Sequence, residues 1–223
     1  MIKINVRPMT AIDASRCASI HVRSFQGFFL TFLGMRFLNE LYAAIVHDPS
    51  CIAFVAEEDN EVVGFAAGTC FASGLYSRLI RRRIWRFGWA SLGALLRKPT
   101  ILPRLLRALT LPSQKTPAPN CGTLMSIAVL PEVQRRGIGR LLVHAFLDEA
   151  RRRELENIDL TTDSLDNDGV NRFYQRLGFS LLRTYTTPEG RKMNEYITAL
   201  PVSFSSATSR ERSPFVLSEN RVA

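Results

Sequence analysis

Cysteine and histidine are scarce in this sequence, and neither is grouped. The four cysteines stand singly along the chain, and there are three histidines. No pair of them has the short spacing that is typical of a zinc site or of a disulfide framework. We therefore predict no bound metal and no structural disulfide, and we expect a reducing, cytoplasmic compartment.

Long apolar runs are also missing. In the basic middle of the chain the longest uncharged run, residues 87–96, has ten residues, whereas a helix that spans a bilayer needs about 20. Residues 1–7 include Lys3 and Arg7 and lack the apolar stretch of a secretory signal. The sequence therefore predicts neither a transmembrane helix nor export.

Acidic residues are absent between residues 75 and 112. This segment holds nine arginine and lysine residues, which equals the formal charge of +9 of the whole chain. On a helix, its arginines and its apolar residues would form separate stripes: Arg78, Arg82 and Arg86 against Ile80, Ile84 and Phe87. With Trp85 and Trp89 beside them, this pattern is typical of a membrane surface or an anionic partner. The alternative is that the apolar stripe covers the core of the domain.

Hydrophobic periodicity predicts a single α/β domain with a mixed sheet. Apolar and alternating runs indicate strands at residues 2–6, 51–57, 61–69, 122–130, 158–162, 179–186 and 192–200. Helical spacing indicates helices at about residues 10–23, 34–47, 138–150 and 169–177, with Ile12, Cys17 and Ile20 facing inward in the first. We expect one domain over residues 1–200 with a basic helical insertion at about 71–120, and a disordered tail over 201–223.

The most informative stretch joins the strand at 122–130 to the helix that follows it. After Pro131, the run Gln134-Arg135-Arg136-Gly137-Ile138-Gly139-Arg140 leads into the helix. The first turn of a helix has unpaired N–H groups and a partial positive charge, and glycine lets a phosphate approach that backbone. The pattern predicts a pyrophosphate site, although the glycines could also serve only the turn. Leu142 replaces the third glycine of a dinucleotide motif and no glycine precedes a lysine, so neither common nucleotide loop is present.

Two motifs together resemble those of one enzyme family. The run from Gln134 to Gly139, with Val129-x-Pro131 before it, resembles the Gln/Arg-x-x-Gly-x-Gly/Ala signature of the GCN5-related N-acetyltransferase superfamily. Residues 167–179, with Asn167, Tyr174 and a closing Gly-Phe, resemble the second signature of that family. The resemblance covers about residues 2–199 without the insertion. It implies a mostly antiparallel central sheet of about seven strands, with a splayed parallel pair and flanking helices.

The resemblance also implies a co-substrate, acetyl-CoA, and roles for individual residues. The implied CoA-binding residues are Ile127, Ala128 and Val129 along the pantetheine, Gln134, Arg135, Arg136, Gly137, Ile138, Gly139 and Arg140 around the pyrophosphate, and Asn167 and Asn171 on the pantetheine arm. Tyr174 would protonate the departing thiolate. The alternative for Tyr174 is packing beside Phe173 and Phe179, and the alternative for Asn167 is an N-cap of the helix.

The sequence does not reveal the general base that must take the proton of the amine. Residues 123–127 contain no carboxylate, although many members of the family carry one on this strand. The candidates are Asp163 at the end of the next strand, Glu195 on the last strand, and ordered water. Each carboxylate has the alternative of being solvated or bound in a salt bridge.

The expected acceptor is a small primary amine such as an amino sugar or a polyamine, and the positive charge favours an anionic or lipid-linked one. The alternatives are acetylation of a protein N-terminus or lysine, and a catalytically silent CoA-binding or membrane-associated regulator. Further partner predictions are peripheral membrane contact through residues 75–112 and a homodimer. Nucleic acid is disfavoured, because base-reading and stacking side chains are scarce among the arginines.

Overall fold

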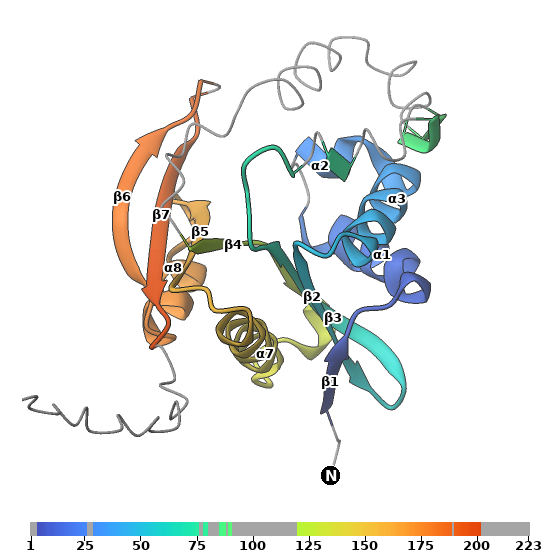
Figure 1. Cartoon of the computed structure of the whole chain (residues 1–223), viewed down its shortest axis with the longest axis horizontal. Helices are drawn as coiled ribbons and strands as arrows, with labels where there is room; N and C mark the ends of the chain where they lie inside the picture. The colour runs from blue at the N-terminus through green and yellow to red at the C-terminus, as the bar shows by residue number, and fades with distance from the viewer. Residues whose placement is uncertain are drawn as a thin grey trace, which may run out of the picture.

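The structure, a computed structural model, describes residues 4–25, 29–75, 78–79, 85–87, 89–90, 120–188 and 190–201. Its strands form one seven-stranded sheet in the order β1-β2-β3-β4-β5-β7-β6 (Figure 1). The strand bounds are β1 Ile4–Pro8, β2 Cys51–Glu58, β3 Glu61–Thr69, β4 Cys121–Val129, β5 Asn157–Asp163, β6 Ser180–Thr186 and β7 Lys192–Ala199. Strands β4 and β5 are parallel and the other neighbouring pairs are antiparallel, which confirms the predicted mixed sheet.

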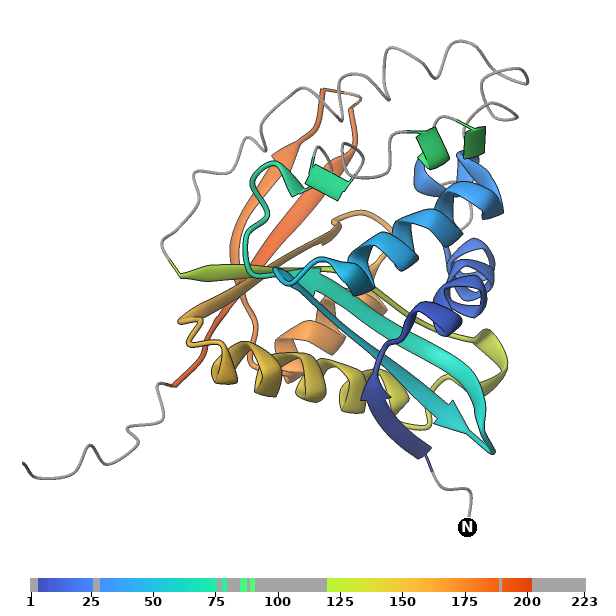
Figure 2. The same ribbon diagram turned by 45° about the vertical axis from the view of Figure 1, so that its right-hand side comes forward.

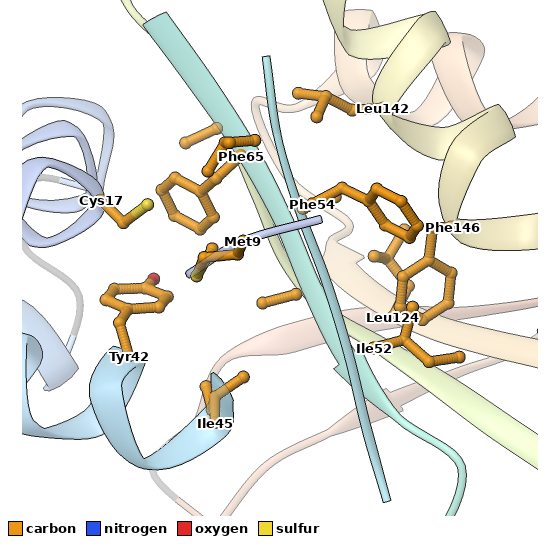
Figure 3. Packing of buried hydrophobic residues seen from close by; sticks show 14 of the residues in the cluster. Met9, Cys17, Tyr42, Ile45, Ile52, Phe54, Phe65, Leu124, Leu142 and Phe146 are labelled. Carbon is orange, nitrogen blue, oxygen red and sulfur yellow. The ribbon is translucent and has the colours of Figure 1, made fainter. Parts of the chain in front are cut away.

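Helices cover both faces of the sheet (Figures 1 and 2). Their bounds are η1 Ala11–Asp13, α1 Ala14–Ser24, α2 Phe29–Phe32, α3 Gly34–His47, η3 Pro131–Val133, α7 Ile138–Arg152 and α8 Asp168–Arg176. Figure 3 shows Cys17 of α1 and Tyr42 of α3 on one side of β3, and Leu142 and Phe146 of α7 on the other. The α1/α3 face and the α7 face of the sheet are therefore distinct surfaces.

Helix α7 packs very closely on β3 because glycine leaves room for it. A Cβ atom at Gly68 would lie 2.7 Å from the ring of Phe146 and 2.2 Å from the carbonyl oxygen of Thr123 on β4. On the opposite face, the rings of Tyr42 and Phe65 meet with their centroids 4.9 Å apart. Both helix layers are thus fixed against β3 by large, fully buried side chains, as in other close-packed protein interiors.

The start of the first helix differs from the prediction. Ile12, expected to face inward, is 92% exposed, so that assignment is wrong. The turn is held by polar groups instead: the Asp13 carboxylate accepts hydrogen bonds from both Arg7 terminal nitrogens, at 2.8 and 2.9 Å, and from Thr10. These bonds, first of all those from Arg7, lower the pKa of Asp13 to about 2. Because the ion pair fixes η1, this turn does not need an apolar anchor.

The basic insertion is described only in part. Leu75, Leu79 and Phe87 are buried, and the Phe87 ring meets Phe37 of α3 at 5.1 Å between centroids. Trp85 and Trp89, in contrast, are 82% and 74% exposed. The predicted stripe residues Ile80, Arg82 and Ile84, together with residues 91–119 and the predicted tail from 202 onward, lie outside the described residues. Among the residues that are described, no helix is both long and apolar enough to cross a bilayer.

Candidate active site

Strands β4 and β5 begin as a parallel pair and then separate. Their pairing covers only Cys121–Thr123 against Asn157–Asp159. Within the described residues, the rest of β4 has β3 as its only strand partner. The backbone edge of Ile127, Ala128 and Val129, which faces β5, is therefore available to an extended ligand, in the way that an open sheet edge accepts an added strand.

A β-bulge lies where β4 leaves β5. Gly68 pairs with Leu124 and Ala67 with Ser126, so Met125 is an extra residue in β4. A bulge bends the strand that carries it and increases the local twist. Strand β4 therefore turns away from β5 at the point where its free edge begins.

The loop after β4 presents unpaired backbone N–H groups. Arg135 and Gly137 have positive φ angles, +64° and +81°, and a Cβ atom at Gly137 would meet nothing within 4 Å. No backbone N–H group of residues 135–140 donates a hydrogen bond to another group in the described part of the chain. Unpaired N–H groups at the positive end of a helix such as α7 are the donors that commonly bind an anion such as a pyrophosphate.

Side chains of the loop differ in their roles. The Gln134 side-chain amide donates to the carbonyl oxygen of Val129 at 3.0 Å and so ties the loop to the end of β4. Arg136 pairs with Glu58 at 2.9 Å, and Arg140 donates to His144 at 3.2 Å. Arg135 makes no ion pair with any described residue, which leaves its charge available to a ligand.

Helix α8 is attached to the sheet by buried amides. The Asn171 side-chain oxygen accepts from the Thr162 hydroxyl at 2.6 Å and from Asn194 at 3.4 Å, and its nitrogen donates to the carbonyl oxygen of Asp163 at 3.2 Å. Asn167 stands at the N-cap position, but its side chain donates to the same carbonyl, at 3.2 Å, and does not cap the helix. Asn171 is thus occupied inside the protein, whereas Asn167 makes a single long bond.

Tyr174 lies one turn after Asn171 on the same side of α8. Its ring packs edge-on against Phe173 and Phe179, with centroids 5.1 and 5.6 Å away, and the residue is 5% exposed. Burial raises the pKa of the Tyr174 phenol well above its usual value. The phenol therefore keeps its proton at physiological pH and can donate it to a stronger base.

Both candidate base carboxylates are bound to arginine. Asp163 accepts two hydrogen bonds of 2.7 Å from one nitrogen of Arg191, and Glu195 accepts one of 2.6 Å from Arg183. The Asp163 side chain is 28% exposed and that of Glu195 is 4% exposed. The two lie on neighbouring strands, because Thr161 pairs with Glu195 and Asp163 with Met193. Of the two, Asp163 can exchange a proton with solvent more directly.

Comparison with known sequences decides the family. The model of the Acetyltransferase (GNAT) family matches residues 18–179, which include the β4 edge, the donor loop and α8. The chain belongs to the GNAT acetyltransferase family. Acetyl-CoA is the co-substrate of this family, and the donor loop and the open β4 edge of this chain fit its diphosphate and its pantetheine. No group of three or more potential metal ligands is found among the described residues.

Individual GNAT relatives resemble parts or all of the chain. The [ribosomal protein bS18]-alanine N-acetyltransferase of Escherichia coli K12 is 36% identical over 85 residues, which cover 36% of this chain and 56% of that protein. The chain thus spans little more than half the length of this curated relative. The structure of a ribosomal-protein-alanine N-acetyltransferase from Brucella melitensis has a TM-score of 0.59 and 16% identity, and covers 88% of this chain and 99% of its own. A Thermoplasma acidophilum PaiA N-acetyltransferase in complex with coenzyme A has a TM-score of 0.53 at 12% identity, over 86% of this chain and 98% of its own. At these identities the two structures establish the shared fold.

One polar group beside the GNAT site could not be seen in the sequence. His21 Nδ1 lies 2.7 Å from the Tyr42 hydroxyl, which lies 3.4 Å from the hydroxyl of Ser126 on β4. The three residues come from α1, α3 and β4, separated by up to 105 positions in the chain (126 − 21). Each one alone looks like an ordinary core or strand residue. The only sequence signal is a histidine and a tyrosine on the apolar sides of two helices.

Proposed function

We propose that this GNAT protein transfers the acetyl group of acetyl-CoA directly to a primary amine. The observation that carries the proposal is the row of unpaired N–H groups at residues 135–140, next to the open edge of β4. The loop would hold the diphosphate. The backbone of residues 127–129 would hold the pantetheine and orient the thioester, with an N–H group that polarises its carbonyl.

The proposed chemistry is a single acyl transfer. The amine nitrogen forms a bond to the thioester carbon while the carbon–sulfur bond breaks. Tyr174 donates its proton to the departing sulfur, which suits a phenol that burial keeps protonated. The proton lost by the amine goes to Asp163, to Glu195 or to water. Asp163 is the favoured carboxylate of the two, because its greater exposure lets it pass the proton on.

For the acceptor we propose a small primary amine, such as an amino sugar or a polyamine. The N-terminal amine of a protein is a second candidate, supported by the bS18-alanine acetyltransferase that is 36% identical over 85 residues. Both acceptors present the same reacting group, an unprotonated primary amine. They differ in what surrounds it, so a panel of acceptors can separate them.

The decisive experiment follows free thiol after mixing the protein with acetyl-CoA and a panel of amines. The panel contains glucosamine and its phosphate, spermidine, an alanine-initiated peptide and the same peptide with a blocked N-terminus and an internal lysine. Calorimetry measures CoA binding in parallel. Thiol release with any one amine supports the proposal and identifies the acceptor class. Tight CoA binding without thiol release would instead favour a silent CoA-binding regulator.

We further propose that the insertion touches an anionic membrane surface. Exposed Trp85 and Trp89 flank Arg86, whose side chain is 64% exposed and lies 3.7 Å from the Glu40 carboxylate of α3. Phe87 anchors the segment to α3. Tryptophan and arginine are the side chains that favour a lipid interface. Co-sedimentation with phosphatidylserine vesicles should fall after Trp85→Ala and Trp89→Ala, and no binding by the wild type would end the idea. The homodimer stays a prediction from the sequence.

A further inference from the structure

Three side chains form a polar connection between the helical core and β4. His21 and Tyr42 are 4% and 1% exposed, and the bond between His21 Nδ1 and the Tyr42 hydroxyl is 2.7 Å long. The Tyr42 hydroxyl also lies 3.4 Å from Ser126 Oγ, and Ser126 is partly exposed. Burying polar groups in a core costs free energy unless they are paired. A series of three hydrogen-bonded polar side chains that leads from the core to β4 is therefore a candidate for a functional role.

Ser126 lies beside the proposed path of the co-substrate. It follows the bulge residue Met125 directly and precedes the open edge formed by residues 127–129. It pairs with Ala67 and touches Tyr42, which places its side chain on the α1/α3 face of the sheet. The donor loop begins α7, which packs on the opposite face. An arm that runs from the loop through the opening between β4 and β5 therefore brings its reactive end toward the face of Ser126.

The direction of the hydrogen bonds in this series determines whether Ser126 can accept a hydrogen bond from a ligand or donate one to it. Burial lowers the pKa of His21 to about 4, so its ring is neutral at physiological pH and can accept at Nδ1. When the Tyr42 hydroxyl donates to His21, its oxygen remains as an acceptor for the Ser126 hydroxyl. Ser126 Oγ, whose hydrogen is then directed to Tyr42, keeps its lone pairs and can accept a hydrogen bond from an N–H group.

We propose that Ser126 contacts the acceptor amine, and that Tyr42 and His21 are positioning residues that fix the direction of its hydroxyl. The inference deepens the proposed function and rests on it. When Nδ1 accepts from Tyr42, the ring proton is on Nε2, which has no hydrogen-bond partner in the described structure.

The test uses Ser126→Ala, Tyr42→Phe and the double variant in the full-length protein, with the best amine of the panel as the probe. Each single variant should raise the KM for that amine about tenfold, the effect of one lost hydrogen bond to a polar ligand. The KM for acetyl-CoA should stay within about twofold. Because the two residues act through one hydroxyl, the double variant should resemble Ser126→Ala and not the product of both effects.

Two controls separate this role from a loss of packing. Tyr196→Phe removes the hydroxyl of another fully buried tyrosine and should leave the amine KM unchanged. Ser126→Thr keeps a hydroxyl at the position and should restore most of the amine binding that Ser126→Ala loses. Should Tyr42→Phe fold poorly, His21→Leu removes the acceptor of the Tyr42 hydroxyl and should raise the amine KM. His21→Gln, with an amide that can still accept from Tyr42, should keep the amine KM within about threefold.

The possible results separate a failure of the proposed function from a failure of the role of Ser126 alone. If the wild type binds CoA but acetylates no amine, the proposed function and this inference both fail. If the wild type is active and Ser126→Ala has the wild-type amine KM, only the inference fails. If the fold-increases of the amine KM in Ser126→Ala and Tyr42→Phe multiply in the double variant, Tyr42 does not act through Ser126 and its positioning role is overturned.

Discussion

Phe173 of α8 lies directly beside Gly139 in the first turn of α7: a Cβ atom at Gly139 would be 3.5 Å from Phe173 Cζ. The two sequence signatures, one around the donor loop and one on α8, therefore touch in space. The next residue, Tyr174, packs edge-on against the same Phe173 ring. The helix that follows the proposed diphosphate loop and the helix that carries the proposed acid therefore meet at this aromatic side chain.

Gly137→Ala should weaken CoA binding about tenfold or more. A Cβ atom at this position would point into open space where the diphosphate is proposed to lie. Gly190→Ala is a matched control, because Gly190 has nearly the same φ, +83° against +81°, and also an unobstructed Cβ position. Both variants should lose about 1–2 kcal/mol of stability from the left-handed backbone. Titration calorimetry should show weaker CoA binding only for Gly137→Ala, and equal affinity in both variants would contradict the donor loop.

Tyr174→Phe should lower kcat by about 100-fold or more with little change in CoA affinity or thermal midpoint. The phenylalanine ring keeps the contacts with Phe173 and Phe179 and removes only the proton donor. Thiol release at saturating acetyl-CoA measures the effect. A variant with wild-type kcat would mean that Tyr174 serves packing alone.

Asn171→Leu should destabilise the fold by about 2–3 kcal/mol. The substitution removes the partner of the Thr162 hydroxyl and of the Asn194 amide, and leaves both unsatisfied in a buried place. Asn167→Ala breaks only one bond of 3.2 Å and should lose less than about 1 kcal/mol. Urea denaturation compares the two. A larger loss at Asn167 would contradict the assignment of Asn171 as the buried tether of α8.

Because of His21, the free energy of unfolding should fall as the pH is lowered from about 6.5 toward 4. The folded-state pKa of His21 is lowered to about 4 by burial, so in this window the unfolded state binds more protons and unfolding is favoured. The stability present above the unfolded pKa should decline by up to about 3 kcal/mol by pH 4. In the variant His21→Phe, the free energy of unfolding should fall by up to about 3 kcal/mol less than in the wild type between these pH values. Urea denaturation at each pH measures the difference.

Most of the fold could be predicted from local patterns. Helix α3 and strand β3 have the predicted bounds, because Pro49 follows the apolar spacing of α3 and because Asp59 and Asn60 adopt the positive φ angles of a tight hairpin turn. Ile12 was misplaced because an ion pair between Arg7 and Asp13, not apolar burial, fixes the first turn. Local patterns contain no information about such a pair.

The candidate site was predictable to a lesser degree. Its glycine loop and its tyrosine follow motifs that a sequence displays directly. The partners of Asp163 and Glu195 could not be predicted, because Arg191 and Arg183 reach them across strands from positions 28 and 12 residues away. The connection from His21 through Tyr42 to Ser126 depends on how two helices lie on the sheet, and only the three-dimensional arrangement brings those residues together.

The extra residue in β4 has a consequence for how the sheet could change by insertion and deletion. Leu124 and Ser126 already point to opposite faces, as adjacent strand residues do, so the chain could lose Met125 without exchanging the faces of its neighbours. The shortened strand would be free to continue its ladder along β5. We expect the protein without Met125 to fold with β4 and β5 paired along more of their length. The opening between these strands, where the co-substrate is proposed to bind, would then be closed. In this sheet, we therefore expect the single extra residue at position 125 to keep β4 and β5 apart beyond their short parallel pairing.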